Sequence, residues 1–80
     1  LFVDVETTGL DPNKDEILEL AMLPFRYSID GMVIEVLEPF DRLREPSSPI
    51  HPEITALTGI TDAMVAGKTI DPDEVSRFAS

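Results

Sequence analysis

Apolar and polar positions along the chain predict three β-strands in its first half. Residues 1–6 are apolar at positions 1, 2, 3 and 5, which is typical of a strand covered on both faces. Residues 16–27 alternate over two faces and predict a second strand; residues 16–22 would also suit a helix, but the proline that follows favours the strand. Residues 32–38 predict a third strand, paired antiparallel with the second across a turn at residues 28–31.

The second half predicts a loop and short helices. Residues 39–49 contain three prolines and two serines, and we expect them to form an exposed connection. Apolar patterning resumes directly afterwards, so this loop does not mark a domain boundary. Pro52 is expected to begin a short helix that Gly59 ends, and Thr61 to cap another short turn that closes at Gly67.

A further helix start is predicted at Asp71. Asp71 would be the N-cap, Pro72 the first helical residue and Glu74 the partner that completes a capping box. The apolar stripe of this helix stops at Ser80, after two turns and only three predicted strands. We therefore expect residues 1–80 to be the N-terminal part of a single larger α/β domain.

Composition excludes several classes of function. The chain has 16 acidic and six basic residues, a net charge of −10 and a pI near 4.2. This charge argues against passive binding of a phosphate backbone, but not against an enzyme that holds phosphate through metal ions. The lack of cysteine excludes disulfides, thiolate catalysis and cysteine zinc sites. With neither a membrane span nor a signal peptide in the sequence, a cytoplasmic enzyme is the default expectation.

The first predicted strand carries two acids in its apolar run, Asp4 and Glu6. A side-chain period of two places both carboxylates on one face of the strand. Such a pair persists in a buried strand only with a proton, a strong donor or a cation between its members, and Mg²⁺ and Mn²⁺ favour oxygen ligands of this kind. The alternative is a strand end in solvent, and the residue chemistry alone favours neither interpretation.

The residues around this pair resemble a known family. Residues 2–10, FVDVETTGL, followed by residues 15–21, DEILELA, resemble the first motif of the DEDD 3′–5′ exonucleases, particularly the proofreading epsilon subunits of bacterial DNA polymerase III. Residues 50–65, IHPEITALTGITDAMV, resemble the family segment between the first and second motifs. The resemblance implies a ribonuclease-H-like α/β fold, with a mixed sheet and the acids near one end of its central strand.

The resemblance also implies roles for individual residues. Asp4 and Glu6 would be the catalytic metal ligands, with Asp4 bridging two Mg²⁺ or Mn²⁺ ions and Glu6 binding one of them. Contacts with the 3′-terminal nucleotide are implied for Thr7, Thr8, Leu10, Glu53 and Thr58, the last at a position where some relatives have histidine.

The implied reaction is hydrolysis of the terminal phosphodiester bond at a nucleic acid 3′ end, on single-stranded DNA or on RNA, with a DNA polymerase as a further partner and no membrane. The family's remaining metal ligands and its general base have no counterparts in residues 1–80, so this stretch alone is expected to be inactive. The alternatives are a non-catalytic, exonuclease-like binding module of a polymerase complex and a related 3′–5′ exoribonuclease.

Two other polar residues are given structural roles. Glu19, in the second predicted strand, is interpreted as a structural acid at the sheet edge. His51 is the only histidine and precedes Pro52 in a loop, outside any motif that would make it a general base. We interpret His51 as a capping or surface residue.

Overall fold

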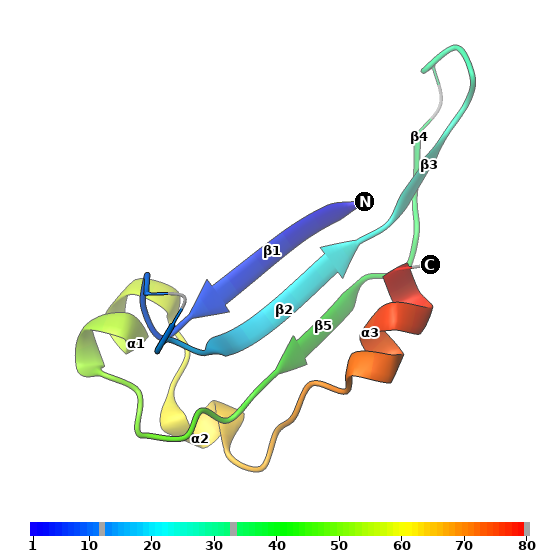
Figure 1. Cartoon of the computed structure of the whole chain (residues 1–80). Coiled ribbons are helices and arrows are strands. Elements are labelled where there is room, and N and C mark those ends of the chain that lie inside the picture. The colour runs from blue at the N-terminus through cyan, green and yellow to red at the C-terminus, as the bar shows by residue number, and fades with distance from the viewer. Residues whose placement is uncertain (12, 33, 80) are drawn as a thin grey trace.

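The described residues form a mixed α/β structure of five short strands followed by three short helices (Figure 1). The computed structural model describes residues 1–11, 13–32 and 34–79. The strands are β1 (Phe2–Thr7), β2 (Ile17–Leu23), β3 (Phe25–Tyr27), β4 (Ile34–Val36) and β5 (Phe40–Leu43). The helices are α1 (Pro52–Thr58), α2 (Asp62–Val65) and α3 (Pro72–Ala79). None of the helices in this part of the chain is long and apolar enough to cross a membrane.

Three strands form the main sheet, in the order β1-β2-β5, with both pairings antiparallel. The predicted strand over residues 16–27 is confirmed as a strand rather than a helix, but it divides at Pro24. Proline has no N–H to donate to a sheet neighbour, whereas its carbonyl accepts the Leu37 N–H at 3.0 Å. The chain therefore leaves the main sheet after Leu23 and continues as β3.

The predicted hairpin is confirmed between β3 and β4, which pair antiparallel and project away from the main sheet (Figure 1). Its turn is closed by the Gly31 N–H, which donates to the Ser28 carbonyl at 2.9 Å, and Gly31 has a φ of 72°. Glycine is favoured there because positive φ is strained for residues with a Cβ. The third predicted strand was too long, since β4 covers only Ile34–Val36; residue 33 lies outside the described residues.

The prediction of an unstructured loop over residues 39–49 is wrong at its start, because Phe40–Leu43 form β5. Phe40 is buried, and its ring centroid lies 4.9 Å from that of Phe78 on α3. Asp41 and Arg42 are exposed. This strand has only four residues and one buried ring. Its alternation of apolar and polar positions is too short to be recognised among the prolines that surround it.

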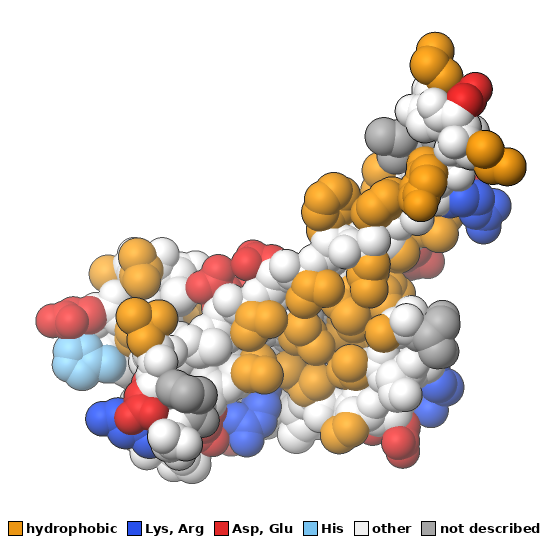
Figure 2. All heavy atoms as spheres, turned by 45° about the horizontal axis from the view of Figure 1, so that its top comes forward, with side chains coloured by type: hydrophobic (Ala, Val, Ile, Leu, Met, Phe, Trp, Pro, Cys, Tyr) orange, Lys and Arg blue, Asp and Glu red, His pale blue; other side chains and the backbone are white. Residues whose placement is uncertain are grey.

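The prediction that residues 1–6 form a strand is confirmed, but the described residues neither cover both faces of β1 nor place it at the centre of the sheet. β1 is an edge strand, with β2 in the centre, and Phe2 and Val3 are 66% and 57% exposed. Figure 2 shows hydrophobic side chains gathered over one side of the sheet and along the β3–β4 hairpin. An apolar run reports β-propensity as well as burial, and α3 contacts β5 rather than β1 through its phenylalanine.

The core lies where β2 meets the helices. Leu18 is fully buried and packs with the three apolar side chains of the helical segment, Ile50, Ile60 and Val65. The predicted α1 and α2 are confirmed: the His51 ring caps α1, Gly59 ends it with a φ of 80°, and Thr61 caps α2. The capping interpretation of His51 is thereby confirmed, and α1 and α2 are held against β2.

The predicted start of α3 is confirmed, but its capping box is not formed. The Asp71 carboxylate accepts the Asp73 N–H at 2.9 Å, as expected of an N-cap. Glu74, however, accepts hydrogen bonds from Arg42 at 2.8 and 3.1 Å. A bidentate guanidinium–carboxylate pair is stronger than a bond to one N–H, and it attaches α3 to β5.

Candidate active site

Four carboxylates share one face of the main sheet. Asp4 lies opposite Ala21, and Glu6 lies opposite Glu19 on β2. Ala21 in turn lies opposite Asp41 on β5. Directly opposed residues of antiparallel strands project to the same side, so the register gathers acids from all three strands of the sheet.

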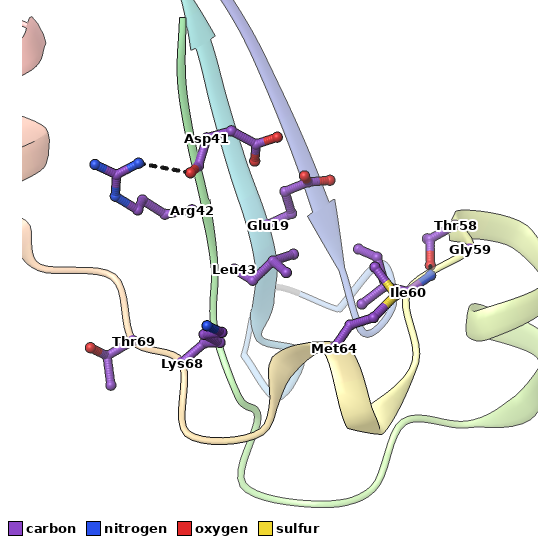
Figure 3. Close-up of a pocket in the computed structure, with 10 residues that line it drawn as sticks. All are labelled: Glu19, Asp41, Arg42, Leu43, Thr58, Gly59, Ile60, Met64, Lys68 and Thr69. Carbon is purple, nitrogen blue, oxygen red and sulfur yellow. Dashed lines mark hydrogen bonds between the residues drawn. The ribbon is translucent and has the colours of Figure 1, made fainter.

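The prediction that Glu19 lies at a sheet edge is wrong, because β2 is the central strand of the main sheet. Glu19 lies on this strand, beside Asp41 in Figure 3. A hydrogen bond to Asp41 raises the pKa of Glu19 to about 7, with further contributions from burial and from the charges of Asp41, Glu6 and Asp4. The Glu19–Asp41 pair thus retains a proton close to neutral pH because like charges crowd this face.

Asp4 and Glu6 can supply only part of a metal site. In the ranges that the structure describes, no three acidic or histidine side chains are arranged to hold one metal ion. Mg²⁺ is usually bound by one or two protein carboxylates, with waters and substrate phosphates completing its coordination. The donor chemistry of the face fits such an ion, and its other ligands must come from outside this set.

The turn after β1 holds three of the predicted substrate contacts, and two of them already have partners. The Thr8 N–H donates to the Glu16 carbonyl at 2.9 Å, while its hydroxyl accepts the Glu16 N–H at 2.9 Å. The Thr7 hydroxyl donates to the Gly9 carbonyl at 2.5 Å. Leu10, by contrast, has a fully exposed side chain. Of these three side chains, that of Leu10 is available to a ligand.

The two predicted contacts on α1 lie in different surroundings. Thr58 lines a cleft beside the acidic face, and its hydroxyl donates to the Ile54 carbonyl at 2.8 Å and accepts the Ile60 N–H at 3.1 Å. Glu53 is exposed in the first turn of α1 and is not among the cleft residues. The structure thus brings Thr58, but not Glu53, to the same cleft as Glu19 and Asp41.

The cleft has a volume of about 550 Å³ and extends from the acidic face to α2 (Figure 3). Leu43, Ile60 and Met64 give it an apolar wall, and Lys68 contributes an ammonium group. Sequence reasoning missed Asp41 and Lys68. Asp41 was placed in a loop, and only the β2–β5 register brings it to the acids; nothing in the sequence links Lys68 to them.

Comparisons with known proteins agree on one family. The family model described as "Exonuclease" (RNase_T) matches residues 1–80. The PolC-type DNA polymerase III of Latilactobacillus sakei is 40% identical over 75 residues, which cover 94% of this chain and 5% of that protein. The Listeria monocytogenes PolC-type DNA polymerase III is 39% identical over 72 residues, which cover 90% of this chain and 4% of that protein.

Among solved structures, exonuclease X in complex with 5′-overhanging duplex DNA matches with a TM-score of 0.64 and 30% identity. The match covers 95% of this chain and 40% of that one. The chain thus spans only a small part of the polymerases and less than half of the exonuclease X chain. The predicted α/β, ribonuclease-H-like fold class is confirmed by this neighbour, and so is the resemblance seen in the sequence: the chain belongs to the exonuclease family.

Proposed function

We propose that this chain supplies Asp4 and Glu6 as metal ligands of a 3′–5′ exonuclease, which hydrolyses the terminal phosphodiester bond at a nucleic acid 3′ end. The observation that carries the proposal is that Asp4 and Glu6 share one face of the sheet with Glu19 and Asp41. A hydrogen bond to Asp41, with burial and the neighbouring charges, raises the pKa of Glu19 to about 7. Membership of the exonuclease family supports the same conclusion. A divalent cation beside Asp4 and Glu6 relieves this crowding.

The proposed role of each acidic residue follows from its position in the sheet. When bound, two Mg²⁺ or Mn²⁺ ions would activate a water molecule and stabilise the leaving oxygen. Asp4 would contact both ions and Glu6 one of them. Glu19 and Asp41 lie beside this pair on β2 and β5, where they share a proton and their remaining negative charge attracts cations.

The proposed substrate contacts surround this face. Leu10 packs against the 3′-terminal base, because its exposed side chain is otherwise left in water. Thr7 and Thr8 contribute their methyl and backbone surface, since their hydroxyls are already bonded within the connection. Thr58 lines the cleft at the edge of the nucleotide. Glu53, outside the cleft, contacts the nucleotide from the first turn of α1.

Single-stranded DNA is the proposed substrate, with a DNA polymerase as partner and a cytoplasmic location. The named relatives support DNA as the nucleic acid, because they are PolC-type DNA polymerases and an exonuclease in complex with 5′-overhanging duplex DNA. We further propose that residues 1–80 are the N-terminal part of one exonuclease domain. On their own they would be inactive, because the family's other metal ligands and general base have no counterpart among them.

The test uses the complete natural protein, Mn²⁺ and single-stranded DNA labelled at either end. The 3′ label is expected to appear at once as mononucleotide, while the 5′ label stays on progressively shorter strands. Asp4→Asn should reduce the rate by at least about 100-fold, since a lost ligand removes several kcal/mol of charge stabilisation. Asp73→Asn is the matched control, because Asp73 is exposed on α3.

Four outcomes would contradict parts of the proposal. Equal rates for Asp4→Asn and the wild type would remove Asp4 from the site. Prior release of the 5′ label would reverse the polarity. Binding without hydrolysis by the wild type would favour the non-catalytic module, whereas faster cleavage of a matching oligoribonucleotide would favour the exoribonuclease.

A further inference from the structure

The connection between β1 and β2 (Figure 1) is organised around one carboxylate, that of Asp15. Its Oδ1 accepts the Thr8 hydroxyl at 3.0 Å, and its Oδ2 accepts the Asp11 N–H at 2.8 Å. The Asp15 N–H donates to the Asp11 carbonyl, also at 2.8 Å. A single side chain thus ties the end of β1 to the turn that follows it.

Gly9 shows how closely Asp15 fits under this turn. A Cβ at position 9 would lie 2.5 Å from Asp15 Oδ2 and 2.7 Å from its Cγ. Gly9 is not among the glycines with positive φ in the described residues, so its backbone conformation is open to alanine. Glycine is therefore favoured here, because a Cβ at position 9 would displace the Asp15 carboxylate and break its hydrogen bonds.

Leu10 extends from this tied turn with its side chain fully exposed. Thr7, Gly9, Leu10 and Asp15 line one shallow cleft. A flexible turn would let Leu10 fold back onto neighbouring apolar surface, away from water. The bonds to Asp15 oppose that collapse, so the leucine side chain remains in position before any ligand arrives.

We propose that Asp15 is a positioning residue, which holds the turn at residues 7–10 so that Leu10 meets the base of the 3′-terminal nucleotide. This inference rests on the proposed function, which supplies the contact between Leu10 and the base. Asp15 itself touches neither the substrate nor a metal. Because a rigid turn removes the entropy cost of ordering Leu10 during binding, the effect of Asp15 falls on substrate binding rather than on the chemical step.

The experiment compares two single-stranded DNA substrates on the complete natural protein: one with a normal 3′-terminal nucleotide and one whose 3′-terminal nucleotide lacks its base. Asp15→Ala and Leu10→Ala should each raise KM for the normal end by about tenfold with kcat nearly unchanged, the size expected of one lost base contact. On the abasic end both variants should match the wild type, because Leu10 has no base to contact.

Asp30→Ala is the matched control. Asp30 also accepts hydrogen bonds from a hydroxyl and a backbone N–H, those of Ser28 and Met32, but it lies in the β3–β4 hairpin turn. The Asp30→Ala variant should leave KM for both the normal and the abasic end unchanged. If Asp15→Ala fails to fold, Asp15→Asn serves, because it keeps the size and one acceptor; the same base-dependent rise in KM, but smaller, is expected.

A double-mutant cycle adds a second readout. Gly9→Ala forces the turn away from Asp15 and should raise KM for the normal end as Asp15→Ala does. Combining both changes should add little to Asp15→Ala alone, because the colliding carboxylate is gone. Additive effects, or equal losses on normal and abasic ends, would overturn the positioning role.

The KM values of Leu10→Ala show whether the role of Asp15 alone is wrong or the proposed contact between Leu10 and the base is wrong as well. If Leu10→Ala shows the base-dependent rise and Asp15→Ala does not, the role of Asp15 is wrong and the proposed function stands. If Leu10→Ala affects both ends alike, the contact with the base is wrong, and the role of Asp15 falls with it.

Discussion

Glu16 directly precedes β2 and Glu19 lies within it, three residues further on, yet their surroundings shift their pKa values in opposite directions. Glu16 accepts hydrogen bonds from the Ser47 hydroxyl at 2.8 Å, the Ser47 N–H at 3.0 Å and Arg44 at 3.1 Å, and these bonds lower its pKa. Glu19 instead faces Asp41 and the acids of β1, which together with burial raise its pKa to about 7.

This difference separates structural from functional carboxylates in an acidic chain. Donors from the segment after β5 surround Glu16, so its charge helps to hold that segment against β2. Within the described residues, the carboxylates of the shared face receive no hydrogen bond from a serine or an arginine. Glu19 instead shares a hydrogen bond with Asp41, which favours its protonated form. The chain has a net charge of −10, so acids alone do not indicate a site. Carboxylates that lie close together without such hydrogen-bond donors indicate the face of the sheet that a cation would stabilise.

The largest expected effect contrasts Glu19 with its neighbour Leu18. Leu18 is fully buried in the core, so Leu18→Ala should lower the free energy of unfolding by about 2–5 kcal/mol. Glu19→Gln should leave stability unchanged or raise it at pH 8, because it removes one charge from a crowded face. Thermal unfolding of both variants of the natural protein checks this contrast. A large loss of stability in Glu19→Gln would show that Glu19 is a structural acid after all.

A smaller effect should appear in the pH dependence of stability, with opposite signs for the two acids. The pKa of Glu19 rises from 4.5 to about 7 on folding, so its contribution is fully present below pH 4.5 and is lost as pH rises to 7. After screening by solvent it amounts to less than about 1 kcal/mol. The pKa of Glu16 is lowered, so its contribution is present above 4.5 and is lost as pH falls through the lowered value.

Unfolding curves measured from pH 8 down to below the lowered pKa of Glu16 cover both contributions. Glu19→Gln should remove the loss of stability between pH 4.5 and 7, and Glu16→Gln should remove the loss on the acid side. Identical pH profiles for the two variants would show that Glu16 and Glu19 do not contribute to stability with opposite pH dependence.

The smallest effect is expected at Ser47. Ser47→Ala removes one of the hydrogen bonds to Glu16 and leaves those from the Ser47 N–H and Arg44. The melting temperature should fall less than in Leu18→Ala, and the pKa of Glu16, followed by NMR, should move up towards 4.5. A pKa that does not move would mean that the hydroxyl does not stabilise the Glu16 charge.

The sequence predicted those parts of the fold that local chemistry determines. Proline at the start of α1, glycine at its end and the Asp-Gly turn of the hairpin each impose a backbone conformation on their own neighbours. The exposure of β1 could not be predicted, because an apolar run does not reveal which element covers it. β5 was missed because its position depends on pairing with β2 and on the contact of Phe40 with Phe78.

The candidate site was predicted only in part for the same reason. Asp4 and Glu6 share a strand, so the period of two was enough to place them together. Asp41 joins them only through the β2–β5 register, over a sequence separation that no local pattern reports. The crowding of Glu19 likewise depends on three paired strands, and so does the raised pKa that marks this face.

Binding of Mn²⁺ to the complete natural protein tests directly whether Asp4 is a metal ligand. Calorimetric titration at pH 8 compares the wild type with Asp4→Asn and with Asp73→Asn, which removes an exposed acid from α3. The account predicts that Asp73→Asn binds Mn²⁺ like the wild type, whereas Asp4→Asn binds it more than about tenfold more weakly. Equal affinities in all three proteins would contradict it.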